Sequence, residues 1–165
     1  MAEGSFDLEK MMNTLAQQEV DGYTFYEKVA AGATNEKTKN AFMKYAKDER
    51  RHETFYKKQA KKYSGKAIMI DKDDAAFIEM LLSSPNPIKM AEQSSDSKTM
   101  YSKEQAEKIA EKLESDTIML LGQIMSASPE LAKEKAFRDA LREERFHLSS
   151  IRQSQADFLA GHMML

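Results

Sequence analysis

A short pattern of one glutamate and one histidine occurs twice in the chain, as Glu49-x-x-His52 and as Glu144-x-x-His147. Residues three apart on an α-helix lie on one face, with a rise of about 4.5 Å between them. Each pattern therefore presents a carboxylate and an imidazole in the same direction, as a metal site requires. Both patterns lie within apolar residues at helical spacing, so both pairs are expected to point into the interior of a helical protein.

Most of the chain has the 3.6-residue period of amphipathic helices, and no β-strands are expected. A first helix is predicted over about residues 6–31, with Glu19 in the middle of its apolar stripe. Thr34 or Asn35 can cap a second helix, which runs to about Tyr63. The loop between the two helices is short, so they are predicted to be antiparallel neighbours.

The helical pattern breaks over about residues 64–101, where one short amphipathic helix is predicted within residues 73–82. Such a segment is too long for a tight turn and indicates a crossover at the end of a bundle. Ser102 begins a capping box and a third helix, and Ser128 precedes a proline that starts a fourth. The sequence thus predicts an all-α four-helix bundle with a long crossover between its second and third helices, as a single domain over residues 1–165.

Short loop, long crossover and short loop are the connections of a ferritin-like bundle. Its metal site takes one Glu from each of two helices and Glu-x-x-His from each of the other two. The chain offers this set in order, as Glu19, Glu49 with His52, Glu114, and Glu144 with His147. A carboxylate in a packed core is costly unless it is paired or coordinates a cation, and two divalent cations would neutralise four carboxylates. Carboxylate and imidazole ligands favour iron, or manganese, over thiophilic metals.

At this level of detail the chain resembles the di-iron domain of the rubrerythrin family, from about Asp7 to Asp157. The resemblance also rests on the pair Glu111-x-x-Glu114. Ferritin-like carboxylate proteins in general need one Glu on the third helix, whereas rubrerythrins are similar to this chain in having two.

The resemblance implies a role for each ligand of a di-iron centre. Glu49 and Glu114 would bridge the two iron ions, and Glu19 and Glu144 would be terminal ligands. His147 would bind the second iron.

The resemblance further implies that Glu111 and His52 alternate as ligands of the first iron when its redox state changes. Five carboxylates suit two ferric ions, whereas a neutral imidazole suits the ferrous pair. The alternative for Glu111 is a solvent-facing side chain in a charged run. Tyr26, two turns after Glu19, falls where the family has a tyrosine that can hydrogen-bond a bound peroxide or a ligand carboxylate.

The family's activity is the reduction of hydrogen peroxide to water with electrons from the diferrous centre. Rubrerythrins proper carry a cysteine-ligated rubredoxin domain, whereas this chain has no cysteine. A separate rubredoxin or a flavoprotein is therefore expected to be the electron donor. Two alternatives stay open: a ferritin-type ferroxidase that uses dioxygen, and another di-metal enzyme such as a manganese catalase.

Charge and hydropathy argue against some partners. The 25 basic and 27 acidic residues give a net charge of −2, which favours neither nucleic acid nor an anionic membrane. The first residues lack the features of a signal peptide, and no apolar run reaches the ~18 residues of a membrane span. The chain is therefore expected to be cytoplasmic, and both the resemblance and the apolar pair Phe158-Leu159 indicate a homodimer.

Overall fold

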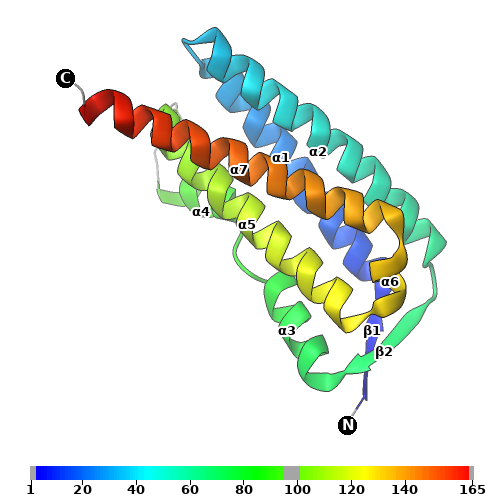
Figure 1. Ribbon diagram of the computed structural model, residues 1–165. Coiled ribbons are helices and arrows are strands. Elements are labelled where there is room, and N and C mark those ends of the chain that lie inside the picture. The colour runs from blue at the N-terminus through cyan, green and yellow to red at the C-terminus, as the bar shows by residue number, and fades with distance from the viewer. Residues whose placement is uncertain (1–2, 95–100, 164–165) are drawn as a thin grey trace.

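The computed structural model describes residues 3–94 and 101–163. Its four longest helices are α1 (Leu8–Gly32), α2 (Glu36–Lys62), α5 (Lys103–Ala127) and α7 (Lys135–Met163). Helix α1 packs along α2, and α5 packs along α7, so the bundle consists of two helical hairpins placed against each other (Figure 1). The predicted all-α bundle with a long crossover is confirmed. Within the described residues, no helix has the length and apolar character needed to cross a membrane.

The predicted caps explain where two of the long helices begin. The side chain of Asn35 accepts hydrogen bonds from the backbone N–H groups of Lys37 and Thr38, at 2.8 and 3.3 Å. At the start of α5, Ser102 and Gln105 exchange both hydrogen bonds of a capping box. These bonds satisfy backbone donors that the first helical turn leaves free.

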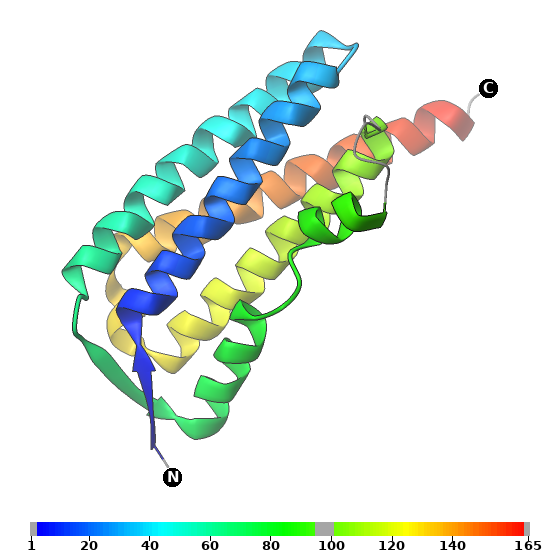
Figure 2. The same cartoon turned by 180° about the vertical axis from the view of Figure 1, so that it is seen from behind.

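The crossover contains more regular structure than the sequence pattern predicted. After β2 (Ala67–Asp71) come α3 (Lys72–Leu82) and α4 (Pro87–Ser94), and both helices pack against α5 (Figure 2). Helix α4 was not predicted, because Pro87 was interpreted as the end of helical structure. Proline instead occupies the first helical position, where its fixed φ is favourable.

The expectation of no strands is wrong. Strand β1 (Glu3–Asp7) pairs antiparallel with β2, and Gly4 lies opposite Ile70. Five-residue strands are too short to show a clear alternation of polar and apolar residues, and Phe6 also fits the stripe of the following helix. Asp7 ends β1 and caps α1 by accepting from the backbone N–H of Lys10 at 3.0 Å, so α1 begins later than predicted.

The predicted fourth helix is divided into α6 (Pro129–Lys133) and α7. The backbone of Glu134 between them is extended, with φ −70° and ψ 120°. The carboxylate of Glu134 accepts hydrogen bonds from Lys62 and Tyr63 at the end of α2. The break therefore fixes the start of α7 to the neighbouring hairpin.

The apolar core consists of two separate clusters, one toward each end of the bundle. The first includes Leu15, Tyr56 and Phe137, and the second includes Phe25, Phe42 and Ile151. Along each long helix the buried apolar residues of the two clusters are separated by buried polar residues. The middle of the bundle is therefore a polar layer enclosed by apolar packing.

Candidate metal centre

Six side chains from the four long helices form the polar layer, and each is at most 4% exposed. They are Glu19 of α1, Glu49 and His52 of α2, Glu114 of α5, and Glu144 and His147 of α7. These are six of the seven residues predicted as metal ligands. Their ring nitrogens and carboxylate oxygens form two overlapping groups, in each of which the atoms lie within 4.8 Å of one another.

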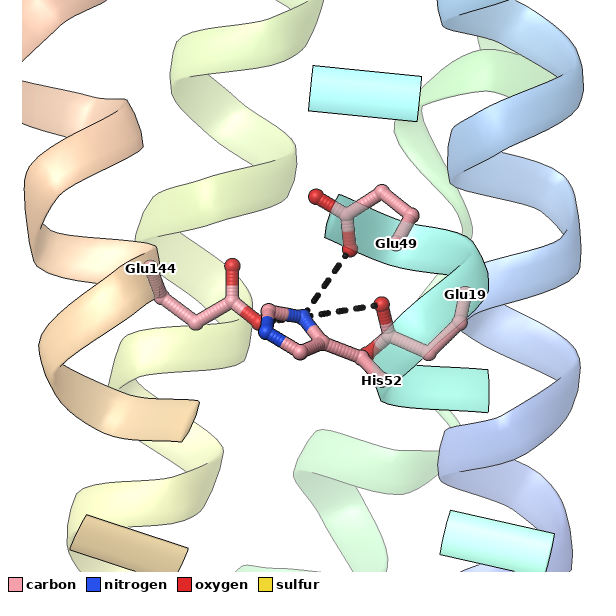
Figure 3. A group of neighbouring side chains, drawn as sticks. All are labelled: Glu19, Glu49, His52 and Glu144. Carbon is pink, nitrogen blue, oxygen red and sulfur yellow. Dashed lines mark ion pairs between the residues drawn. The ribbon is translucent and has the colours of Figure 1, made fainter. Parts of the chain in front are cut away.

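The first group consists of Glu19, Glu49, His52 and Glu144, with His52 in its centre (Figure 3). The Nδ1 atom of His52 lies 2.9 Å from Oε1 of Glu144 and 3.4 Å from Oε2 of Glu49. It lies 3.7 Å from Oε2 of Glu19. One nitrogen and three carboxylates thus converge on a single point.

The second group consists of Glu49, Glu114, Glu144 and His147. The Nδ1 atom of His147 lies 3.3 Å from Oε1 of Glu49. It lies 3.6 Å from both Glu114 Oε1 and Glu144 Oε2. The second group therefore repeats the composition of the first, with Glu114 in the place of Glu19.

Glu49 and Glu144 belong to both groups, so these are the carboxylates placed to bridge two cations. This differs from the expected roles, in which Glu114 was a bridge and Glu144 a terminal ligand. The positions of these residues are parallel in the two hairpins, because Glu19 precedes Glu49 by 30 positions and Glu114 precedes Glu144 by 30 positions. Each hairpin thus contributes one terminal carboxylate from its first helix and one shared carboxylate from its second.

Several inward-facing atoms of the polar layer have no hydrogen-bond partner among the described residues. They are Oε1 of Glu49, both carboxylate oxygens of Glu144, and Nδ1 of His52 and of His147. These atoms lie close to one another, but the angles between them do not fit hydrogen bonds. Buried polar atoms are almost always satisfied, so the convergence of five unsatisfied ones fits a pair of cations held between them. Oxygen and imidazole donors suit iron or manganese.

The electrostatics of the layer lead to the same conclusion. Burial, followed by the charge of Glu49, raises the pKa of Glu19 well above its usual value. Burial, followed by the charges of Glu144 and Glu49, raises the pKa of Glu114 in the same way. No lysine or arginine forms an ion pair with these carboxylates in the part of the chain that the structure describes. Their charge must be balanced by protons or by bound cations.

Each histidine is oriented by an acidic residue of the other hairpin. Nε2 of His52 lies 2.7 Å from Oε2 of Glu143, and Nε2 of His147 lies 3.2 Å from Oδ2 of Asp48. A carboxylate at Nε2 holds the ring proton there, which leaves the Nδ1 lone pair directed into the polar layer. Burial by itself lowers the pKa of His52, but the carboxylates of Glu144 and Glu19 outweigh it and raise that pKa.

Arg51 connects the two acidic residues that orient the histidines. Its Nη2 atom donates to Oδ1 of Asp48 and to Oε2 of Glu143, both at 2.9 Å. Asp48 was not predicted as a functional residue. The signal was present in the sequence, because an acidic residue directly precedes the ligand glutamate in both motifs, Asp48-Glu49 and Glu143-Glu144.

Two buried tyrosines adjoin the polar layer. The hydroxyl of Tyr26 donates a hydrogen bond to Oε1 of Glu114, so the structure places Tyr26 beside a carboxylate of the polar layer. Burial and the charge of Glu114 raise the pKa of Tyr26, which keeps the phenol protonated. The hydroxyl of Tyr56 is buried and has no hydrogen-bond partner among the described residues, and burial and the charge of Glu19 raise its pKa.

Glu111 is the one predicted ligand that lies outside the polar layer. Its side chain is 33% exposed and accepts hydrogen bonds from Nε of Arg152 at 2.9 Å and from Nε2 of Gln155 at 3.2 Å. The bond with Arg152 lowers the pKa of the Glu111 carboxyl. Glu111 precedes Glu144 by 33 positions rather than 30, so it lies a helical turn away from the place equivalent to Glu19. This arrangement matches the alternative of a solvent-facing glutamate.

Comparisons with known proteins agree with this geometry. A sequence model of the family described as rubrerythrin matches residues 3–60 and 16–154. Among solved structures, the chain is similar to a ferritin-like diiron-carboxylate protein from Thermotoga maritima, with a TM-score of 0.63 and 15% identity. The match covers 92% of this chain and 96% of that one, and at such low identity it shows the fold alone. A comparison with curated proteins gives no match.

Replacement of Glu114 should remove metal, whereas replacement of Glu111 should not. After anaerobic loading with ferrous ion and desalting, we expect about two ions per chain in Glu111→Gln and about one in Glu114→Gln, because only Glu114 faces the layer. Absorbance of a ferrous chelate after acid release measures the content. If Glu111→Gln held as little iron as Glu114→Gln, Glu111 would be a ligand after all.

Removal of the Asp48 carboxylate should weaken metal binding without removing a ligand. We expect Asp48→Ala to bind cobalt(II), measured by titration of its visible absorbance, about tenfold more weakly, because His147 loses the group that orients it. Asp116→Ala is the control, since Asp116 is a half-buried acid of α5 whose ion pair is with Lys112. Equal affinities in the two variants would contradict the orienting role.

Proposed function

The chain belongs to the rubrerythrin family, and from this and the geometry of its polar layer we propose that it reduces hydrogen peroxide to water at a di-iron centre. The observation that carries the proposal is the pair of overlapping ligand groups that share Glu49 and Glu144. A pair of ions held by common carboxylates is suited to a reaction that needs two electrons at once. Hydrogen peroxide takes up two electrons and two protons and is converted to two molecules of water.

Each ion would be held by residues of both hairpins. Glu19 and His52 would bind one iron, Glu114 and His147 would bind the other, and Glu49 and Glu144 would bind both. When bound, the two iron ions supply the electrons by passing from the ferrous to the ferric state. The two apolar clusters on either side keep bulk water away from the ligands, which strengthens their electrostatic interactions with the ions.

Tyr26 is placed to hold a proton at the site. Its phenol donates to Oε1 of Glu114, and burial and the charge of Glu114 raise the pKa of Tyr26, so the phenol stays protonated. The phenol proton would therefore be available where a peroxide oxygen must be protonated as the O–O bond breaks. The Tyr26 hydroxyl also fixes the orientation of the Glu114 carboxylate.

The electrons would come from a donor outside these 165 residues. The chain contains no cysteine, so it cannot form a rubredoxin-type iron centre of its own. We propose a separate rubredoxin or flavoprotein as the donor. A homodimer stays part of the proposal, and the exposed Phe158 and Leu159 at the end of α7 support it.

Anaerobic rapid mixing of the ferrous protein tests this function. We expect oxidation by hydrogen peroxide to be at least about tenfold faster than oxidation by the same concentration of dioxygen, followed by absorbance of the ferric product. Faster oxidation by dioxygen would favour a ferroxidase. A protein that retained manganese but no iron would favour a manganese catalase.

The hydroxyl of Tyr26 should affect the peroxide reaction and not the iron content. We expect Tyr26→Phe to retain its iron and to react with peroxide roughly 100-fold more slowly, because general acid catalysis is lost at Glu114. Tyr23→Phe is the matched control, since Tyr23 lies on the same helix but its ring stacks with Arg50. Equal peroxide rates in the two variants would show that Tyr26 only fills space.

A further inference from the structure

A glycine occupies the middle of the inward-facing stripe of α1. Gly22 is buried and lies three residues after Glu19 and four before Tyr26, so all three share one face of the helix. Its φ is not positive. A Cβ atom on Gly22 would lie 3.5 Å from Cδ2 of Leu113 and 3.6 Å from Cγ of Glu49, which are ordinary contacts.

Neither the backbone nor the packing therefore requires glycine at this position. Glycine within a helix is less stable than alanine, so the chain retains a destabilising residue beside a shared ligand. What glycine provides here is a space of about one methyl group between α1 and α5, next to Glu49 and Leu113.

On the outer side of Leu113 lies a cavity of about 270 Å³ between α1, α5 and the crossover. Its lining includes Gln18, which is adjacent to Glu19, and Leu113 and Thr117, which lie on either side of Glu114 in the sequence. Leu113 is thus the wall between the cavity and the space at Gly22. Figure 2 shows that the crossover lies on the same side of the bundle as α1.

Residues of the crossover line the outer side of this cavity and make polar contacts with Asp21. Nδ2 of Asn86 donates to Oδ2 of Asp21 at 2.9 Å, and Nζ of Lys89 lies 3.3 Å from the same oxygen. On the histidine side of the polar layer, Asp48, Glu143 and Arg51 lie behind the two imidazole rings. The face between α1 and α5 is the one that carries the space at Gly22.

We propose that Gly22 and Leu113 form the gate of an access route from this cavity to the carboxylate side of the metal centre. The proposal rests on the function proposed above and adds a limit on the size of the substrate. The gate is narrow, because a single Cβ atom on Gly22 would already contact Leu113 and Glu49, so we expect it to favour small molecules such as hydrogen peroxide over alkyl hydroperoxides. Gly22 and Leu113 are thus the residues that determine specificity.

Azide binding to the diferric protein tests the gate independently of any reaction. We expect azide to bind Gly22→Ala about tenfold more slowly than the parent protein in stopped-flow absorbance, since one methyl group at a tight passage has effects of this size. Iron content should be unchanged. The matched control is Gly122→Ala on α5, where an added Cβ meets nothing within 4 Å. Both variants should unfold about 2 °C higher than the parent, but only Gly22→Ala should bind azide slowly.

Two results would overturn the gate. One is azide binding at the parental rate in Gly22→Ala, and the other is loss of iron from that variant, which would mean that glycine is needed to position Glu49. A second variant, Leu113→Ala, should widen the passage. It should restore fast azide binding when combined with Gly22→Ala, and alone it should speed oxidation of the diferrous protein by tert-butyl hydroperoxide about tenfold.

The azide measurement also separates this proposal from the proposed function. Azide binding needs no electron donor and no cleavage of an O–O bond. If the ferrous protein reacted faster with dioxygen than with peroxide, the proposed function would fail while a slow Gly22→Ala variant would still establish the gate. If peroxide were preferred but azide binding were unaffected by either variant, the gate alone would fail.

Discussion

The burial of four carboxylates in the middle of a helical bundle is the constraint on which the rest of the structure depends. An uncompensated carboxylate in a packed interior is costly, and here four of them converge from four helices. The apolar residues of each helix are consequently divided into two clusters, one on each side of the polar layer. Around the layer, Glu143 and Asp48 contact the two imidazole rings, and Tyr26 donates to Glu114. These contacts orient the side chains of the layer as a cation site requires.

The two hairpins place equivalent glutamate and histidine residues in the polar layer. Each supplies a terminal glutamate, then a shared glutamate 30 positions later, then a histidine. The acidic residue before each shared glutamate orients the histidine of the other hairpin. Of the two glutamates of α5 predicted as ligands, Glu114 lies in the polar layer and has the spacing of the first hairpin, whereas Glu111 contacts Arg152. The remaining asymmetry lies outside the ligands, where Gly22 leaves a space on one face of the layer.

The long helices and the six residues of the polar layer could be predicted because each rests on a periodic pattern more than twenty residues long. The capping residues Asn35 and Ser102 marked the boundaries through local hydrogen bonds that are encoded in the sequence. The strands and α4 could not be predicted in this way, because a five-residue strand and an eight-residue helix are stabilised mainly by their contacts with the bundle. Glu111 was assigned from resemblance to a motif, and its contact with Arg152 depends on the rotation of α5 against α7, which the local pattern does not define.

The sharing of Glu49 and Glu144 has a further consequence for how the bundle holds together. The two helices of each hairpin pack closely together, whereas contacts between long helices of different hairpins are few. A cation in either of the proposed positions would be bound by residues of both hairpins. Its binding free energy would then contribute to the association of the two halves as well as to the site itself. Under the proposed function, metal binding and tertiary stability would be coupled, and loss of the metal would loosen the contact between the hairpins and expose the chain to proteolysis.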